Sequence, residues 1–170
     1  MTTSLVRPSL EQVRAWLADV PDPEIPAVSV LDLGIVRDVR WEDDELLVAI
    51  TPTYSGCPAT SVIALEVEAA LRSRGIERLR VERRLSPAWT TDWITHEGRR
   101  RLQAYGIAPP AERANGPSPL DRFLRKSPAI ACPRCASSDT QRVSEFGSTP
   151  CKALYRCNAC LEPFDYFKCL

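Results

Sequence analysis

The chain has 170 residues, of which 44% are hydrophobic and 26% charged, a composition typical of a folded protein rather than a disordered one. Its 22 basic and 22 acidic side chains cancel, so no excess of positive charge favours tight, salt-dependent binding to nucleic acid. No apolar run approaches the roughly 20 residues that span a bilayer, and residues 1–6 lack the charged and apolar blocks of a signal peptide. We therefore expect a cytoplasmic protein with no membrane-bound segment.

The first half of the chain predicts a small α/β (α+β) domain with the order helix, strand, strand, helix, strand. Ser9 and Gln12 have the spacing of a capping box, which predicts the start of the first helix. Residues 46–50 are apolar almost throughout, so their strand should lie in the centre of the sheet. The expected elements are a helix to about Asp19, strands over 34–41 and 45–51, a helix from Pro58 closed by Gly75, and a strand over 76–85.

The middle of the chain predicts a helical extension followed by a linker. Thr95 can cap a helix whose first turn contains Glu97, and Gly106 can end it. Residues 107–128 contain six prolines and glycines with little apolar pattern, so we expect a linker there, with a short helical piece over 120–126.

Six of the seven cysteines lie between Cys132 and Cys169. Cys132 and Cys135 form one C-x₂-C knuckle, Cys157 and Cys160 form another, and two knuckles supply four thiolates for a tetrahedral ion. With strands expected over 140–146, 153–156 and 164–167, this is the layout of a zinc ribbon, although a rubredoxin-like iron site uses the same ligands.

The remaining features of the ribbon leave alternatives open. Cys151 and Cys169 could replace a knuckle cysteine, bind a second metal or pack as small apolar groups, and we favour packing. Tyr155, Tyr166 and Phe167 could stack on bases beside the basic residues of the ribbon, but interspersed acidic residues favour core packing instead.

Cys57 is the one cysteine of the first 131 residues. We predict it at the N-cap of the second helix, directly before Pro58, where the helix dipole lowers the pKa of a thiol. It could be a nucleophile, a ligand of transient iron or of a labile iron–sulfur cluster shared between the protomers of a homodimer or with a partner, or a capping residue in the core. A nucleophile needs a base, yet the sole histidine, His96, lies outside this block and is expected on the surface of the third helix.

Asp22 and Glu24 flank Pro23 before the first strand. The favoured interpretation is a turn in which their carboxylates accept hydrogen bonds from nearby amides. The functional alternative places Asp22 beside Cys57 as a partner.

Several of these motifs resemble the metal–sulfur-cluster biosynthesis family, which includes SufT and the eukaryotic cytosolic iron–sulfur targeting subunit. They are residues 22–26 (DPEIP), 31–36 (LDLGIV), 51–53 (TPT) and the pair Cys57-Pro58. The resemblance covers roughly residues 8–85 and implies an assembly or targeting factor in which Cys57 is the reactive or cluster-binding residue.

Longer strings resemble the family of accessory D components of bacterial phenylacetyl-CoA epoxidase systems. They are residues 86–94 (SPAWTTDWI), 105–110 (YGIAPP), the Cys132–Cys135 knuckle and residues 146–169. The resemblance implies a role in aerobic phenylacetate breakdown, with the epoxidase oxygenase, its reductase and the iron–sulfur assembly machinery as partners. It also implies help in maturing that complex rather than catalysis, whereas a structural or electron-transfer role within the oxygenase is the alternative.

The predicted division is residues 1–88 for the cluster-biosynthesis-type domain, 89–106 for the helical extension, 107–128 for the linker and 129–170 for the four-cysteine zinc ribbon.

Overall fold

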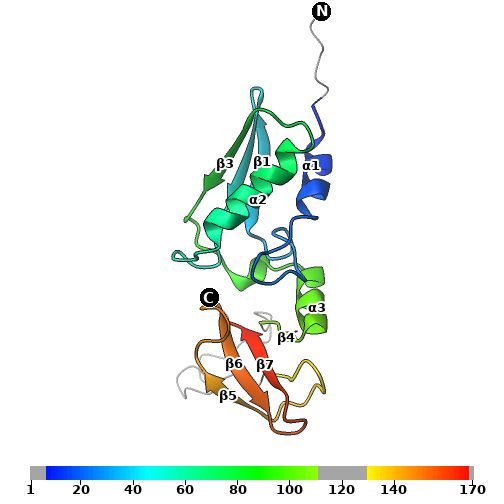
Figure 1. The fold of residues 1–170 in the computed structure, drawn as a ribbon, viewed down its shortest axis with the longest axis vertical. Coiled ribbons are helices and arrows are strands. Elements are labelled where there is room, and N and C mark those ends of the chain that lie inside the picture. Colours follow the sequence, from blue (N-terminus) through cyan, green and yellow to red (C-terminus); the bar gives the residue numbers. More distant parts are fainter. Residues whose placement is uncertain (1–6, 111–129, 169–170) are drawn as a thin grey trace, which may run out of the picture. The chain divides into compact units, whose positions relative to one another are not determined.

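The computed structural model describes residues 7–110 and 130–168, and the chain divides into two compact units, residues 1–88 and 89–170 (Figure 1). The first contains α1 (Leu10–Leu17), β1 (Val36–Glu42), β2 (Glu45–Ile50), α2 (Thr60–Arg72) and β3 (Leu79–Arg83). The second contains η1 (Thr91–Trp93), α3 (His96–Tyr105), β4 (Ile107–Ala108), β5 (Thr140–Ser144), β6 (Lys152–Cys157) and β7 (Pro163–Phe167). Within the described ranges, no helix has the length and apolar character that crossing a membrane requires.

The first helix begins as the capping box predicts. The Ser9 hydroxyl accepts from the Gln12 amide at 3.1 Å, and the Gln12 side chain accepts from the Ser9 amide at 2.9 Å. These two bonds satisfy amides that have no partner inside the helix. The helix ends at Leu17, two residues earlier than predicted, and buries Val13 and Leu17.

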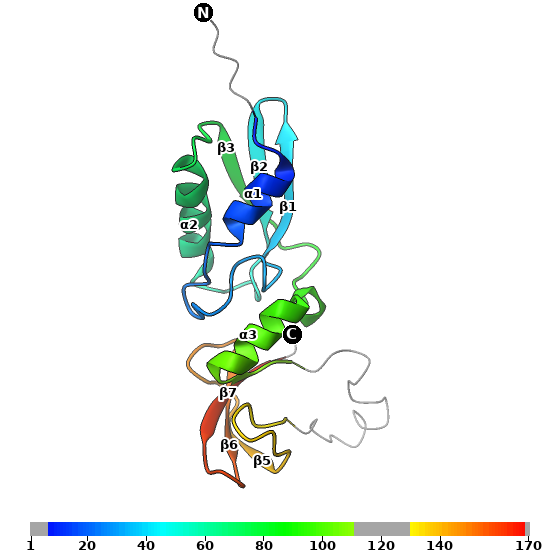
Figure 2. The same cartoon turned by 90° about the vertical axis from the view of Figure 1, so that its right-hand side faces the viewer.

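The sheet of the first unit has the order β1-β2-β3, so β2 is central as predicted. β1 pairs with β2 antiparallel, and β3 pairs with β2 parallel through the crossover helix α2. All residues from Leu46 to Ile50 are buried. Helices α1 and α2 cover one face of the sheet (Figures 1 and 2).

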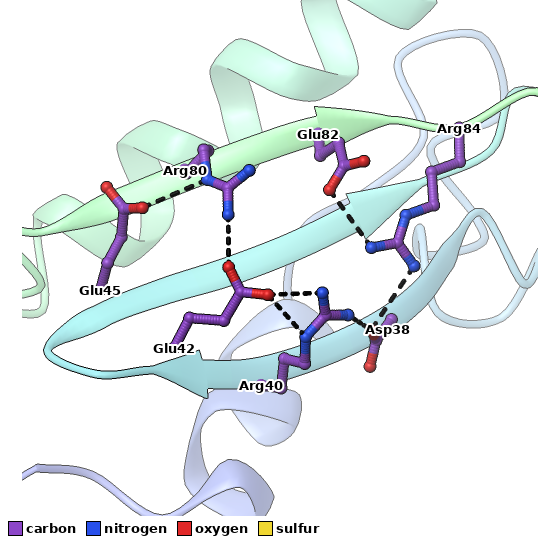
Figure 3. A network of polar contacts seen from close by, with 7 residues as sticks. All are labelled: Asp38, Arg40, Glu42, Glu45, Arg80, Glu82 and Arg84. Carbon is purple, nitrogen blue, oxygen red and sulfur yellow. Dashed lines mark hydrogen bonds and ion pairs between the residues drawn. The ribbon is translucent and has the colours of Figure 1, made fainter.

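The other face of this sheet carries a network of charged side chains from β1, β3, the first residue of β2 and Arg84, which follows β3 (Figure 3). Arg80 on β3 pairs with Glu42 on β1, so the ion pair crosses over β2. Leu47 on β2 is the register partner of both Arg40 and Arg80 and is only 1% exposed. The aliphatic stems of the arginines can therefore cover the apolar centre of the sheet while their charged heads stay in water.

The sheet of the second unit has the order β4-β7-β6-β5. β5, β6 and β7 are the three strands that the sequence predicts. The assignment of Ile107 and Ala108 to the linker is wrong, because these buried residues form β4 and pair with β7. Gly106, at φ 97°, ends α3 and turns the chain so that this apolar pair meets the sheet. The remaining residues of the predicted linker, from 111 to 128, and its short helical piece lie outside the described residues.

The core of the second unit contains the aromatic residues of the ribbon. Tyr155, Tyr166 and Phe167 are 9%, 6% and 1% exposed, so the prediction that they pack in a core is confirmed. Phe167 also packs on Trp89, with 5.9 Å between ring centroids, which joins the segment before α3 to the ribbon. Because the three rings are buried, they are not accessible for stacking on the bases of a nucleic acid.

Candidate functional site

The two cysteine knuckles have the same backbone geometry. The amide of Cys132 donates to the carbonyl of Ser137 at 2.9 Å, and the amide of Cys157 donates to the carbonyl of Glu162 at 2.9 Å. Each bond joins the first cysteine to the residue five positions later, so each knuckle closes on itself and turns its two sulfurs to one side.

The structure brings the four predicted metal ligands together. The Sγ atoms of Cys132, Cys135, Cys157 and Cys160 all lie within 4.8 Å of one another. The distance is 3.7 Å between Cys132 and Cys160 and 3.6 Å between Cys135 and Cys157. A tetrahedral ion with metal–sulfur bonds of about 2.3 Å places its sulfurs about 3.8 Å apart. The arrangement therefore fits one tetrahedral metal ion, and zinc and iron both accept such a ligand set.

The four thiols differ in their exposure. Cys132 and Cys157 are buried, whereas Cys135 and Cys160 are exposed. The Cys160 amide donates to the sulfur of Cys157 at 3.5 Å, and this backbone hydrogen bond is the main reason that the pKa of Cys157 falls to about 7. The lowered pKa of Cys157 favours the thiolate form that a metal ligand requires.

Cys151 lies outside this four-thiol group. Its side chain is 4% exposed, and its sulfur lies 3.0 Å from the Thr149 hydroxyl. This burial agrees with the interpretation of Cys151 as a packing residue. Cys169 lies outside the described residues.

Cys57 lies on the loop between the central strand β2 and the helix α2, but it does not cap that helix. The N-cap is Ala59, and α2 begins at Thr60. The predictions that Cys57 is the N-cap and that Pro58 is the first helical residue are therefore wrong. The Thr60 hydroxyl and amide both donate to the Cys57 carbonyl, at 2.8 and 3.3 Å, and hold Pro58 and Ala59 in a turn before the helix.

The predicted lowering of the Cys57 pKa is also wrong. The pKa of the Cys57 thiol is raised, mainly because the thiol is partly buried and its charged form loses contact with water. Hydrogen bonds with the Ala59 backbone and the Thr60 side chain act in the opposite direction, while the charges of Glu24 and Asp22 raise the pKa further. The tertiary surroundings thus outweigh the helix end, because the thiol lies near acidic groups and partly away from water.

Asp22 adopts the turn that the sequence favours. Its Oδ1 atom accepts from the amides of Glu24 and Ile25 at 2.9 and 2.8 Å, and the side chain is 5% exposed. The charge of the carboxylate nevertheless raises the pKa of Cys57, an effect smaller than that of burial, so Asp22 lies within electrostatic range of the thiol. Sequence reasoning missed Thr60 and gave Glu24 no functional role, although both lie within three residues of a predicted site residue.

Within residues 7–110 and 130–168, the knuckle cysteines form the one group of three or more ligand side chains close enough for a metal. Cys57 therefore offers a single thiol, without a complete set of ligands from the described part of its own chain. His96 is exposed at the first position of α3, as expected.

Comparison with known proteins matches the two halves of the chain to two family models. Residues 10–82 match the model described as iron–sulfur cluster assembly protein, and residues 116–168 match the PaaD zinc beta ribbon domain. An Escherichia coli (strain K12) protein, named as the putative D component of a 1,2-phenylacetyl-CoA epoxidase, is 46% identical over 167 residues. The matched residues cover 98% of this chain and 97% of that protein.

Two further relatives match the first half. The Fe-S protein maturation auxiliary factor YitW of Bacillus subtilis (strain 168) is 34% identical over 84 residues, which cover 48% of this chain and 81% of YitW. A crystal structure of a Bacillus anthracis domain of unknown function, DUF59, is 25% identical, with a TM-score of 0.51, and covers 54% of this chain and 89% of that one.

Proposed function

The chain belongs to the PaaD family, and we propose that it is an accessory factor that supplies iron or an iron–sulfur cluster to the phenylacetyl-CoA epoxidase system through Cys57. The recipient is the oxygenase or the reductase component, and the iron–sulfur assembly machinery is the source. The four-cysteine ribbon holds a structural metal ion, which we propose to be zinc. In this proposal the chain itself catalyses no step of epoxidation.

The position of Cys57 is the observation that carries this proposal. It is a half-exposed thiol on the loop that follows the central strand, and no set of three ligands surrounds it among the described residues. Iron–sulfur clusters that a protein keeps are held by four ligands, typically cysteines. A single thiol can hold iron or a cluster only with ligands from another molecule, which suits a cargo that is passed on.

The relatives support the same role. The half of the chain that contains Cys57 matches an iron–sulfur cluster assembly model and is similar to a protein named as a maturation auxiliary factor. The relative that is similar over the full length is named as a component of an epoxidase. This name is the reason that we propose the epoxidase system as the recipient.

Replacing Cys57 by Ala tests the proposal in cells that grow on phenylacetate. The substitution removes a sulfur from a half-buried position, so we expect a change of only about 1 kcal/mol in the free energy of unfolding. The oxygenase and reductase isolated from these cells should be deficient in iron or sulfide, and growth on phenylacetate should be slow. Cys151→Ala, which removes a thiol from the other unit, should leave both unchanged.

A second measurement separates maturation from catalysis. Purified oxygenase and reductase that already contain their metals should turn over at the normal rate without this chain. A stoichiometric requirement for it in every turnover would contradict maturation.

A structural or electron-transfer component of the oxygenase is the alternative function, and the ribbon favours it in one respect. Its four thiols suit iron as well as zinc, and Cys135 and Cys160 reach the surface, where an electron could enter. Colour distinguishes the two metals, because ferric tetrathiolate is red whereas zinc tetrathiolate is colourless.

A further inference from the structure

The loop that carries Cys57 is anchored at both of its ends. At its start the Thr51 amide donates to the Ile35 carbonyl at 2.8 Å. At its end the Thr60 hydroxyl donates to the Cys57 carbonyl at 2.8 Å. Between these anchors the Cys57 amide donates to the Tyr54 carbonyl at 3.1 Å, so residues 54–57 form a turn. The position of the thiol therefore depends on what holds this turn in place.

Arg83 reaches this turn from the neighbouring strand. It is the last residue of β3 and the register partner of Ile50, the last residue of β2, so the loop leaves the sheet directly beside it. The Nη2 atom of Arg83 donates to the Ser55 carbonyl at 2.6 Å. A hydrogen bond with a charged donor is stronger than one between neutral groups. The guanidinium thus holds the turn at a point two residues before the thiol.

Arg83 differs from the other arginines of this sheet in its partner. The charged network of Figure 3 contains Arg40, Arg80 and Arg84, each paired with a carboxylate. Arg83 pairs with no carboxylate among residues 7–110 and 130–168. Because successive side chains of a strand point to opposite faces, Arg83 points to the other side of the sheet from Glu82. Its place in the strand therefore directs it to the loop and not to the network.

The bond affects the loop more than the whole fold. Arg83 is exposed, and exposed charged side chains contribute little to the free energy of unfolding. Local opening of a loop costs much less free energy than global unfolding, so one hydrogen bond is a large share of that local cost. Loss of the bond should release the turn while β3 and α2 stay folded.

We propose that Arg83 is a positioning residue for Cys57: by holding the Ser55 carbonyl, it fixes the half-exposed thiol in one place for the transfer of cargo. This inference rests on the proposed function, in which Cys57 holds iron or a cluster together with ligands of another molecule. Shared ligation needs every ligand in a defined position, and a mobile thiol would meet this condition only part of the time. Arg83 acts on the cargo through the loop alone.

The first test compares Arg83→Met with Arg84→Met in the full-length chain. Arg83→Met removes the donor to the turn, so hydrogen exchange at the Cys57 amide should become about tenfold faster, the effect of losing one hydrogen bond to a charged group. Alkylation of Cys57 by iodoacetamide should accelerate by up to the same factor, because opening of the turn exposes the thiol. Mass spectrometry of the peptides should show Cys151 of the other unit reacting at its original rate. Arg84→Met removes an arginine that pairs with carboxylates and should leave all these rates unchanged.

Arg83→Lys separates positioning from stability. A lysine ammonium can donate to the same carbonyl, so exchange and alkylation should return most of the way to the rates of the unchanged chain. The melting temperature should stay within about 2 °C in all three variants, since each changes an exposed or half-buried surface group. In cells that grow on phenylacetate, Arg83→Met should give oxygenase and reductase with less iron or sulfide than Arg83→Lys or Arg84→Met gives.

Three results would overturn the inference. The first is that Arg83→Met and Arg84→Met have equal exchange and alkylation rates at Cys57. The second is faster exchange throughout β3 and α2 in Arg83→Met, which would mean general destabilisation. The third is normal delivery of iron or sulfide by Arg83→Met despite a mobile loop.

Failure of the proposed function has a different signature. Normal maturation by Cys57→Ala would refute that function. The exchange and alkylation measurements involve no cargo, so they still decide whether Arg83 holds the loop.

Discussion

Gly147 shows how one residue without a side chain supports a buried ion pair. Lys152 is 4% exposed and pairs with Asp165 at 3.5 Å, while the Ser148 hydroxyl donates to the same carboxylate at 2.9 Å. A Cβ atom on Gly147 would lie 2.4 Å from Asp165 Oδ1 and 3.3 Å from Lys152 Cβ. Because both partners hold the carboxylate in place, it has little freedom to move aside.

Gly147→Ala should therefore destabilise the second unit. The added methyl group must displace the Asp165 carboxylate from Lys152, and we expect a loss of about 1–3 kcal/mol in the free energy of unfolding. Gly56→Ala is the matched control, since a Cβ there meets only the Tyr54 ring at 3.5 Å, an ordinary contact. Denaturant unfolding measures both, and equal stability of the two variants would contradict this role for Gly147.

At the scale of the element, ion-paired side chains lie over the face of the β1-β2-β3 sheet that the helices do not cover (Figure 3). Arg84 donates to Glu82 at 3.2 Å and pairs with Asp38 at 3.5 Å, so it links the two edge strands. Its guanidinium is the main cause that lowers the pKa of Glu82. A carboxyl whose pKa is lower in the folded state stabilises the fold above its unfolded pKa, and this contribution disappears as the pH falls through the folded pKa.

Arg84→Met should raise the pKa of Glu82 towards about 4.3, the value of a free glutamate. The matched control is Arg83→Met, because Arg83 donates to the Ser55 carbonyl instead and does not contribute to the pKa of Glu82. Titration of the side-chain carboxyl by NMR measures the shift, and high salt should reduce it, since the groups are exposed. A pKa of Glu82 that is the same in both variants would refute the pairing.

At the scale of the molecule, the two units depend on different forces. The first buries the apolar central strand β2 and the inner faces of two helices. The second has a small core around Tyr155 and Phe164, with the four knuckle thiols beside it. A core of this size gives little stability without an added ligand. Metal binding should therefore supply much of the folding free energy of the second unit alone.

Removing the metal with a strong chelator should unfold the ribbon and leave the first unit folded. Hydrogen exchange should become fast in β6 and β7 and stay slow in β2, and Trp89 should lose its contact with Phe167. Cys132→Ser should reproduce the effect, and Cys151→Ala should retain one ion per chain because its thiol is outside the cluster. Slow exchange in β6 after chelation, or a full ion in Cys132→Ser, would contradict the assignment.

Features with local causes could be predicted from the amino-acid sequence alone. The capping box at Ser9, the caps of α3 at Thr95 and Gly106, and the apolar run of β2 each depend on residues within one element, so their patterns predicted them correctly. The cysteine spacing likewise identified the four thiols that the fold brings together.

Features that depend on distant partners became visible only in the folded chain. The pairing of β4 with β7 joins residues almost sixty positions apart, and no local pattern specifies it. The pKa of Cys57 was predicted with the wrong sign, because the helix end is a local property whereas burial and the charges of Glu24 and Asp22 are not. The role of Gly147 was not predictable for the same reason, because Gly147 lies on the loop between β5 and β6 whereas its neighbour Asp165 lies on β7. Residue patterns encode periodicity and capping, but desolvation and close approach arise only when separate segments pack together.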